Sequence, residues 1–356
     1  MDLLIDPAFS IINKSKSKRM NIMSTSQLMF ATAWGIIDSQ GGKYPLSKLP
    51  SILDRLKSLG YSGIEIPIVL VMQFGSKKFE ALLKEKGLLA VAMIFSSGAS
   101  PSGGPPTPGN LSVPSDFGIN HPIDPLDGHD VDTHCAIWEG QARECLHIQS
   151  VLHAVTSHTG KDYYSNDEAD KHFAFCTAFE QSTGLVVNHE THRARILYSP
   201  WVVSRILTAH PALHLCADLS HFSCVAESGP LEPEINKVVT NLAPRVRHVH
   251  ARVGFEEGPQ ILDPRLPNWK PYLDGYTTWW TLIFNHAKTR GDAVFSTTPE
   301  FGPPSYAWID MKGATVSNVW SVNHYVGGIC SNLHKQVFGQ GEVTLHSDLE
   351  EGVWDL

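Results

Sequence analysis

The sequence predicts an α/β fold in which eight parallel strands close into a barrel and a helix follows each strand. From Gln27 onward, short runs rich in β-branched and aromatic residues alternate with amphipathic segments, and eight such runs can be counted. Eight consecutive βα units favour a closed parallel barrel over an open doubly wound sheet. A chain of 356 residues with 42% hydrophobic content can also bury the core that such a domain requires.

The predicted strands are short, largely apolar runs that end at polar or turn-forming residues. In chain order they are 28–34, 63–68, 88–95, 151–158, 185–191, 213–220, 246–252 and 293–301. Together they predict a (β/α)8 TIM barrel that occupies residues 26–340 as a single domain. Residues 1–25 are expected to form a flexible N-terminal extension, and residues 341–356 a C-terminal tail.

The segments between the strands carry helix-start and helix-stop signals. In PSILDRLKSLG, Pro50 suits a first helical turn and Gly60 can take the left-handed conformation that ends a helix. In SKKFEALLKEKG, Ser76 is predicted to cap the helix and Gly87 to end it. Both segments place their apolar residues on one face, as a helix covering a barrel must.

Two long irregular segments, 96–128 and 253–273, follow the third and the seventh predicted strands. The first is rich in Gly, Pro and Ser, and the second contains GPQ and several prolines. A loop that follows a barrel strand lies on the C-terminal face, where active sites are built. We therefore expect long loops around a site on this face, although the first segment could equally be a surface insertion.

Composition narrows the class of function. The formal charge is −8, from 28 basic and 36 acidic residues, so the balance does not favour nucleic acid as a partner. The six cysteines form no CxxC pair, which is typical of reduced thiols in an intracellular protein. No apolar run approaches the roughly 18 to 20 residues that span a bilayer, and the N-terminus lacks the apolar region of a secretory signal. The expected location is cytoplasmic, without membrane attachment.

Side-chain alternation along the strands indicates which polar groups enter the barrel. In VRHVHAR, it sends His248, His250 and Arg252 to the inner face, because the apolar residues between them should face the helices. The same reasoning turns Glu65 inward in GIEIPI. His248 lies one layer deeper than His250 and is interpreted as structural. His153 and His189 are expected to face the helices.

The ends of the fifth to the eighth strands supply four groups to one mouth: Glu190, Asp218, His250 and Glu300. Taken singly, each is more often a hydrogen-bonded structural group than a ligand. Three carboxylates in a partly dry cavity repel one another, however, and a divalent cation is the simplest compensation. Three oxygen ligands and one imidazole favour one Mn²⁺, Mg²⁺ or Co²⁺ ion, with Mn²⁺ preferred and Zn²⁺ as a further candidate.

These residues make the chain resemble the xylose-isomerase-like TIM-barrel superfamily of sugar isomerases and epimerases, which also contains endonuclease IV. The matching motifs are Glu190 in NHETHR, the D-x-x-H of Asp218 and His221 in ADLSHF, the H-x-H of His248 and His250 in HVHAR, and Glu300 in TPEFGP. The resemblance covers roughly residues 27–340. This ordered combination is fairly specific for the superfamily and says little about the substrate.

The resemblance implies roles for the matching positions. In the ketose epimerases of this superfamily, four such positions bind one divalent metal, here Glu190, Asp218, His250 and Glu300. The two glutamates there also move protons, which implies that Glu190 and Glu300 are catalytic. The position of His221 contacts substrate oxygens in those enzymes and is taken here as a further catalytic residue.

Six side chains are predicted to contact the substrate: Glu65, His158, His192, His221, Arg252 and Gln260. Arg252 lies closer to His250 than the spacing of the corresponding arginine in the family. Asp162, Arg193 and Glu227 are further candidates. Each of these side chains could instead cap a helix, bond within a loop or support a metal ligand.

Aromatic residues are frequent near the predicted mouth: Trp269, Trp279, Trp280, Tyr306 and Trp308. They would suit a substrate ring stacked on an aromatic side chain, or a substrate larger than a triose. Packing between helices is the alternative, and it is favoured for Trp279 and Trp280 because they fall on a predicted helix.

The predicted reaction is proton removal from a carbon next to a carbonyl or hydroxyl group, which requires a base and stabilisation of the resulting enediolate by the metal. The sequence therefore predicts a divalent-metal-dependent isomerase or epimerase of a sugar or polyol-type small molecule. Expulsion of a hydroxyl or glycosyl-linked group from the same intermediate would instead make the protein a dehydratase or lyase.

Two other functions are less favoured. An endonuclease IV-like phosphodiesterase uses three metals, but here the third strand ends without a histidine and HVHARVGFEEG lacks the D-x-H pair of that enzyme. A non-catalytic barrel would be expected to have lost a ligand, and all four are present. Dimers are common in the resembled superfamily, so a homodimer is a further expectation.

Overall fold

The protein is described by a computed structural model over residues 27–38, 46–96, 130–304 and 306–339. Its strands are β1 (Leu28–Thr32), β2 (Gly63–Pro67), β3 (Leu89–Phe95), β4 (Leu152–His158), β5 (Val187–Glu190), β6 (Leu215–Ala217), β7 (Val246–Ala251) and β8 (Ser296–Pro299). Each strand pairs in parallel with the next, and β8 pairs with β1 to close the barrel. The predicted (β/α)8 TIM barrel is confirmed, and each predicted strand is found.

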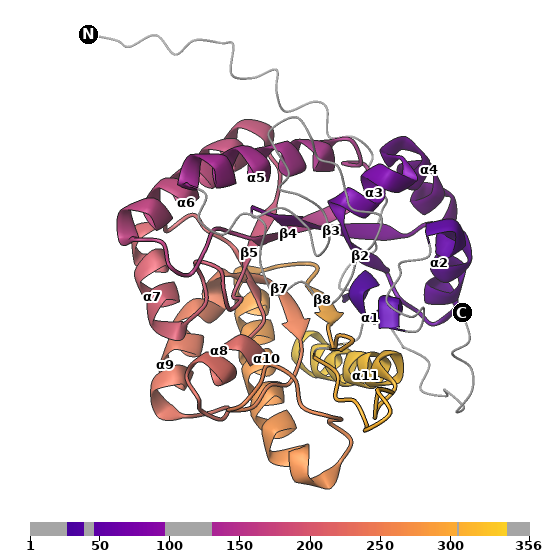
Figure 1. The fold of residues 1–356 in the computed structure, drawn as a ribbon, viewed down its shortest axis with the longest axis vertical. Coiled ribbons are helices and arrows are strands. Elements are labelled where there is room, and N and C mark those ends of the chain that lie inside the picture. The colour runs from indigo at the N-terminus through magenta and orange to yellow at the C-terminus, as the bar shows by residue number, and fades with distance from the viewer. Residues whose placement is uncertain (1–26, 39–45, 97–129, 305, 340–356) are drawn as a thin grey trace.

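Helices surround the strands on all sides (Figure 1). They are α1 (Ala33–Asp38), α2 (Leu49–Ser58), α3 (Ile68–Phe74), α4 (Ser76–Lys86), α5 (Val131–Leu146), α6 (Asn166–Thr183), α7 (Pro200–Ala209), α8 (Ser220–Val225), α9 (Pro233–Leu242), α10 (Lys270–Arg290) and α11 (Val319–Phe338), with short 3-10 turns η3 (Leu46–Lys48), η4 (Ala243–Arg245) and η5 (Pro267–Trp269). None of the helices in the described ranges is long and apolar enough to cross a membrane.

The predicted helix ends are largely confirmed. Pro50 lies in the first turn of α2, and Gly87 ends α4 in the left-handed conformation. The prediction that Ser76 caps α4 is wrong, because Gly75 occupies the cap position and no side chain bonds the first turn. Gly75 has a φ of 95°, which suits the tight turn between α3 and α4.

The main hydrophobic core lies between the strands and the helices. The outward side chains of the strands, such as Ile64 and Ile66 of β2, pack there against buried residues of the helices. Trp279 and Trp280 of α10 are fully buried in this layer, which confirms that they pack between helices. A second cluster of Leu28, Phe30 and Val91 fills the barrel interior at the beginnings of the strands. This apolar cluster occupies the barrel interior near the beginnings of the strands, so the interior near their ends is available for polar side chains.

His153 does not follow its prediction. Its ring stacks on Phe30 with the centroids 5.6 Å apart, so it lies inside the barrel and not against the helices. The cause is a register shift between β3 and β4, where Ala90 pairs with Leu152 but Val91 pairs with Ala154. Such a bulge interrupts the alternation on which the prediction depended.

Several predicted segments lie outside the described residues. These are the N-terminal extension, the C-terminal tail and all but Ser96 of the segment 96–128. The second long segment, 253–273, is described. It folds through a bridge between Phe255 and Gly258 and through η5 before α10 begins.

Candidate metal centre

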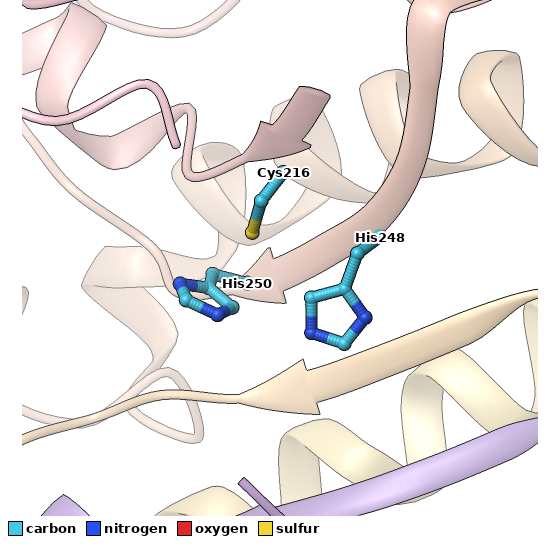
Figure 2. A group of neighbouring side chains, drawn as sticks. All are labelled: Cys216, His248 and His250. Atoms are coloured by element: carbon cyan, nitrogen blue, oxygen red, sulfur yellow. The ribbon is translucent and has the colours of Figure 1, made fainter. Parts of the chain in front are cut away.

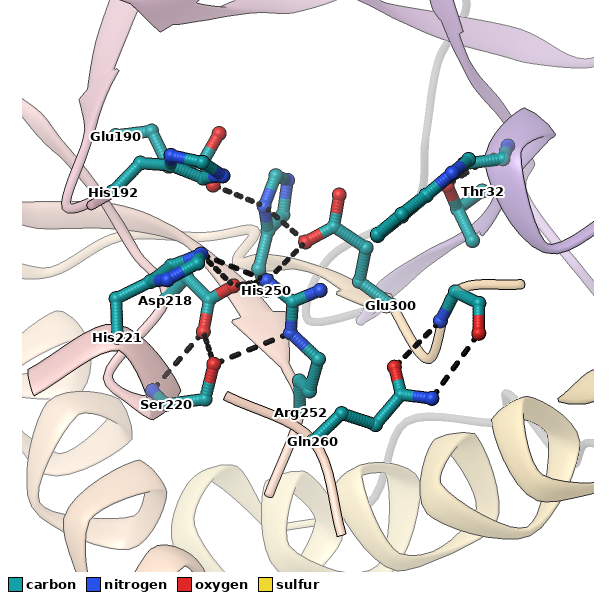
Figure 3. A network of polar contacts seen from close by, with 12 residues as sticks. Thr32, Glu190, His192, Asp218, Ser220, His221, His250, Arg252, Gln260 and Glu300 are labelled. Atoms are coloured by element: carbon teal, nitrogen blue, oxygen red, sulfur yellow. Dashed lines mark hydrogen bonds and ion pairs between the residues drawn. The ribbon is translucent and has the colours of Figure 1, made fainter. Parts of the chain in front are cut away.

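Four acidic and imidazole side chains meet at the ends of β5 to β8. Glu190 ends β5, Asp218 follows β6, His250 lies in β7 and Glu300 follows β8. One potential ligand atom from each lies within 4.8 Å of every other, and all four residues are buried. Figure 3 shows them converging on the ring of His250, with Glu190 and Glu300 reaching it from opposite sides. The structure therefore brings together the four residues predicted from the strand ends.

The two nitrogens of His250 have different partners. Its Nδ1 lies 2.9 Å from a Glu300 oxygen and 3.4 Å from a Glu190 oxygen. Its Nε2 donates a hydrogen bond of 2.9 Å to Glu65, on the other side of the ring. A carboxylate behind a metal-binding histidine fixes the ring and its tautomer. Glu65 therefore orients His250 from the side of the ring opposite the candidate metal site. This position does not favour the substrate contact predicted for Glu65, which remains a prediction.

Below this level lies a closed polar layer. His248 contacts the Ser296 hydroxyl through Nδ1 at 2.7 Å, and its Nε2 lies 3.1 Å from the Thr298 hydroxyl and 3.4 Å from Glu65. Cys216 of β6 points its sulfur toward the two histidines (Figure 2). Although this group also has metal-binding side chains, both nitrogens of His248 are already hydrogen-bonded. The structural interpretation of His248 agrees with these contacts.

Arg252 is the principal cation beside the four residues. It pairs with Asp218 through Nη2, and its Nε donates to the Ser220 hydroxyl at 3.2 Å. Ser220 in turn donates to Asp218 from its backbone nitrogen at 3.0 Å and from its hydroxyl at 2.5 Å. The same Nη2 donates to His221 Nε2 at 3.0 Å (Figure 3). Arg252 thereby links the metal-ligand candidate Asp218 to the substrate-contact candidate His221.

The pKa values of the cluster follow from burial and from these contacts. Burial alone would raise the pKa of Glu190, but His158 and His250 hold it well below its usual range. Burial raises the pKa of Asp218 to about 6 despite the Arg252 charge, with Glu300 and Glu190 adding to the increase. Burial would lower the pKa of His250, but Cys216 and the surrounding carboxylates raise it well above its usual range. Without a metal, the surrounding carboxylates therefore favour the protonated form of His250.

The donor set fits a divalent cation. Both Glu190 oxygens, one Glu300 oxygen and His250 Nδ1 are buried, and their contacts with one another and with His158, at 2.7 to 3.4 Å, are ion-pair contacts without hydrogen-bond alignment. Buried carboxylate oxygens that lack a well-aligned donor are costly, and a cation placed among them would reduce that cost. Oxygen and imidazole ligands suit Mn²⁺, Mg²⁺, Co²⁺ or Zn²⁺ and do not select one of these ions.

Three imidazoles form a row along one side of the mouth. The ring centroids of His158 and His192 are 4.4 Å apart, and those of His192 and His221 are 4.0 Å apart. His158 Nε2 also lies 2.7 Å from a Glu190 oxygen. Burial lowers the pKa of both His192 and His221 well below the usual range, with His158 adding to the decrease for His192 and His192 for His221. These two rings are thus neutral hydrogen-bonding groups next to Glu190.

The opposite side of the mouth is aromatic. Trp34 of α1 meets Tyr306 edge to face at 4.8 Å between centroids, and the Arg252 guanidinium lies 4.9 Å from the Tyr306 ring centre. Gly302 makes this packing feasible, because a Cβ there would lie 2.3 Å from the Trp34 ring. The Gln260 amide bonds the backbone of Gly302 at both N–H and C=O. Gln260 thus joins the loops after β7 and β8, and its predicted substrate contact remains a prediction.

Other candidates lie elsewhere. His189 turns away from the mouth and approaches Glu180 of α6 at 3.2 Å, as predicted. Asp162 and Glu227 are exposed. Sequence reasoning missed Trp34 and Ser220, although each is the last residue of a predicted strand, and that position was the signal that could have identified them.

Comparisons with known proteins support the fold. Neither the family models nor the curated proteins gave a match to this sequence. Among solved structures, D-allulose 3-epimerase from Methylomonas sp. is similar, with a TM-score of 0.51, 14% identity and coverage of 88% of this chain and 99% of that one. Mannonate dehydratase from Streptococcus suis serotype 2 has a TM-score of 0.50 and 9% identity, with coverage of 92% and 99%.

A D-tagatose 3-epimerase-like protein is also similar, with a TM-score of 0.50, 12% identity and coverage of 87% of this chain and 100% of that one. The chain thus shares the TIM-barrel fold of these proteins, which is the fold that the motif resemblance implied. Identities this low establish the fold and leave the reaction to the residues of the site.

Proposed function

We propose that this protein is a divalent-metal-dependent isomerase or epimerase that acts on a sugar or polyol-type substrate. The observation that carries the proposal is the buried group of Glu190, Asp218, His250 and Glu300, with ligand atoms within 4.8 Å of one another and with glutamate oxygens that lack a well-aligned hydrogen-bond donor. The similar folds include proteins named as epimerases and a dehydratase, which is consistent with carbohydrate chemistry at this mouth. We expect the protein to have a small-molecule substrate.

Glu190, Asp218, His250 and Glu300 would hold one metal ion, with Mn²⁺ as the preferred ion in this proposal. When bound, the cation would offset the repulsion among the carboxylates and draw electron density from the substrate oxygens beside the reacting carbon. Glu65 would keep His250 Nδ1 directed at the site, because it occupies the Nε2 proton of the same ring.

Glu190 and Glu300 are the proposed proton-transfer pair. One carboxylate would take the proton from a carbon beside a carbonyl group, and the electron pair of that C–H bond would move toward the carbonyl oxygen. The other, carrying a proton, would return it to the opposite face, and the electron pair would come back to form the new C–H bond. Glu190 and Glu300 both lie close to His250 Nδ1, at 3.4 Å and 2.9 Å, which supports their acting at one metal-bound substrate (Figure 3).

His221 and Arg252 would orient the substrate oxygens. His221 is neutral and buried, and its Nδ1 has no hydrogen-bond partner among the described residues. With its Nε2 occupied by Arg252, Nδ1 carries the proton and can donate a hydrogen bond to a substrate oxygen. Arg252 holds this tautomer and places its positive charge beside the same region.

The proposal is tested by proton exchange. Metal-loaded protein is incubated with ketoses in D₂O, and deuterium incorporation is followed by NMR together with the metal content of each variant. Glu190→Gln and Glu300→Gln should each lower exchange by about a hundredfold or more, since general acid–base catalysis contributes about 10² to 10⁴. Glu85→Gln, an exposed carboxylate on α4, is the control and should exchange like wild type. Full exchange in both glutamate variants would refute the assignment.

The same experiment separates the alternative reaction. A dehydratase would also remove the proton, but its product would be lighter than the substrate by one water, which mass spectrometry detects. An isomerase or epimerase gives a product of unchanged mass apart from the incorporated deuterium. A metal-loaded protein that exchanges no proton in any sugar would contradict both reactions.

A further inference from the structure

We propose that Arg193 binds a carboxylate of the substrate, so that the substrate is a sugar acid and not a neutral sugar. The inference rests on the proposed function, because it concerns the same mouth, and it adds the charge of the substrate to the type of reaction. Its evidence is the environment of Arg193, which no part of the proton-transfer scheme uses.

Arg193 is a half-buried arginine without an acidic partner. It lies three residues after Glu190, in the loop that follows β5. Among the described residues, no carboxylate comes within ion-pair distance of its guanidinium, and its hydrogen-bond contact is a weak one, 4.0 Å from Nη1 to the Cys224 sulfur. Its positive charge is therefore held near the site without compensation.

Three other arginines pair with aspartates, whereas Arg247 donates to the carbonyl oxygens of Pro244 and Val246. Arg205 pairs with Asp170 at 3.0 Å, Arg265 with Asp263 at 2.6 Å and Arg290 with Asp292 at 2.5 Å. An arginine that is partly removed from water without such a partner retains hydrogen-bond donors for a ligand.

The position of Arg193 is fixed by the aromatic side of the mouth. Its guanidinium carbon lies 5.0 Å from the centre of the Tyr306 ring, and that of Arg252 lies 4.9 Å from the same centre. Arg193 therefore stands at the same mouth as His221 and Arg252, and stacking on Tyr306 limits the freedom it would lose on binding.

Arg252 supplies a second unoccupied donor at this ring. Its Nη2 and Nε are bonded to Asp218, His221 and Ser220, but its buried Nη1 has no hydrogen-bond partner in the described residues. A carboxylate beside Tyr306 could accept from Arg193 with one oxygen and from Arg252 Nη1 with the other. Such charge-assisted hydrogen bonds are the ones for which arginine is best suited.

The charge available favours a carboxylate over a phosphate. The charge of Arg252 is already compensated by Asp218, so within the described ranges Arg193 brings the positive charge at this ring that no carboxylate pairs with. One positive charge matches a singly charged carboxylate, whereas a phosphate near neutral pH carries close to two negative charges and needs more donors. A sugar phosphate is therefore treated as an outcome of the test.

The test compares matched pairs of sugars with the metal-loaded full chain. D-fructose and D-fructuronate, and D-tagatose and D-tagaturonate, differ in an acidic group, and D-fructose 6-phosphate represents the phosphate. Deuterium exchange and calorimetric binding are measured for wild type, Arg193→Gln and Arg193→Lys. Arg143→Gln, an exposed arginine of α5, removes the same charge far from any predicted site and serves as the control.

We expect a uronate to bind and exchange, and its neutral partner to bind at least about tenfold more weakly. Arg193→Gln should weaken uronate binding between about tenfold and a hundredfold, which corresponds to one lost hydrogen bond to a charged group, and should leave the neutral sugar unchanged. Arg193→Lys should recover part of the loss, and Arg143→Gln should bind like wild type.

Other outcomes overturn the inference. They are preference for the neutral sugars or the sugar phosphate, an equal effect of Arg193→Gln on neutral and acidic sugars, and a wild type that binds no uronate. If neutral sugars exchange deuterium and Arg193→Gln binds and exchanges every sugar like wild type, the carboxylate contact is refuted and the proposed function stands. If no compound exchanges, the proposed function fails, and calorimetry of uronates with wild type and Arg193→Gln still decides whether Arg193 binds a carboxylate.

Discussion

Replacing Glu65 by glutamine should weaken metal binding, although it changes none of the four candidate ligands. The carboxylate lies behind His250 and accepts the Nε2 proton of that ring at 2.9 Å. Its second contact, to His248 Nε2 at 3.4 Å, is long and is shared with the Thr298 hydroxyl at 3.1 Å. The main loss in Glu65→Gln is therefore the charge-assisted hydrogen bond to His250.

The size of the effect follows from this single bond. Removing the outer partner of a metal-binding histidine lowers metal affinity by about 10- to 100-fold. This corresponds to about 1.4 to 2.8 kcal/mol of binding free energy. Glu65 also contributes to the raised pKa of His250, so in the variant protons compete less strongly with the metal ion for this ring. The deficit should for this reason be larger at about pH 8 than at about pH 6.

The assay is calorimetric titration of the chelator-treated protein with Mn²⁺ at both pH values. Glu180→Gln is the matched control, because Glu180 approaches His189 Nε2 at 3.2 Å on the helix side of β5. It removes a similar carboxylate–imidazole contact away from the mouth and should leave the Mn²⁺ affinity unchanged. If both variants bind Mn²⁺ within about twofold of wild type, Glu65 does not orient a metal ligand and the reasoning is wrong.

Three further predictions concern pH, packing and metal removal. Metal affinity should fall by about tenfold for each unit by which the pH falls, because the ion must displace the proton that the raised pKa keeps on His250. Below about pH 6 the dependence should become steeper, because Asp218 also takes up a proton. Calorimetric titrations in buffers of different ionisation enthalpy count the protons that metal binding releases. Gly302→Ala should lower the free energy of unfolding, measured by urea denaturation, by about 1 to 3 kcal/mol, because the added Cβ would lie 2.3 Å from the Trp34 ring. Gly328→Ala on α11 is the control. No atom lies within 4 Å of its added Cβ, so this substitution should be neutral or stabilising. Removal of the metal with a chelator should leave the circular dichroism spectrum of the protein unchanged, because Arg252 and protonated His250 already compensate part of the carboxylate charge. Loss of the helical signal on addition of chelator would show that the metal is needed for folding.

The strands could be predicted from the sequence because their two faces meet different surroundings. In β2, the isoleucines pack toward the helices and Glu65 points into the barrel, so alternation alone located the inner face. The same rule placed Glu190 and His250 at one mouth, since parallel strands of a barrel end on the same side. His153 shows the limit of this rule, because a bulge between β3 and β4 shifts the register by one residue.

The partners of the site residues were less accessible to sequence reasoning. Arg252 was predicted to reach the substrate, and nothing in HVHAR indicates that it pairs with Asp218 on the neighbouring strand end. Gln260 was predicted as a substrate contact, but its amide is used by the Gly302 backbone. Both contacts depend on how loops of different length fold over the strand ends, and this geometry is set by tertiary packing and not by periodicity.

The pairing of Arg252 with Asp218 explains how so many carboxylates are tolerated in a buried mouth. Without a metal, the protonated His250 ring lies between Glu65, Glu190 and Glu300, and Arg252 compensates Asp218. A bound divalent cation would take over the role of the His250 proton and would share Asp218 with Arg252. Exchange of that proton for a divalent cation would add one positive charge among the carboxylates, so the metal would extend a compensation that His250 and Arg252 begin and that lets the barrel fold before the metal arrives. Arg193 remains a cation at this mouth whose charge no carboxylate of the described residues compensates, which is why we expect its acidic partner in the substrate.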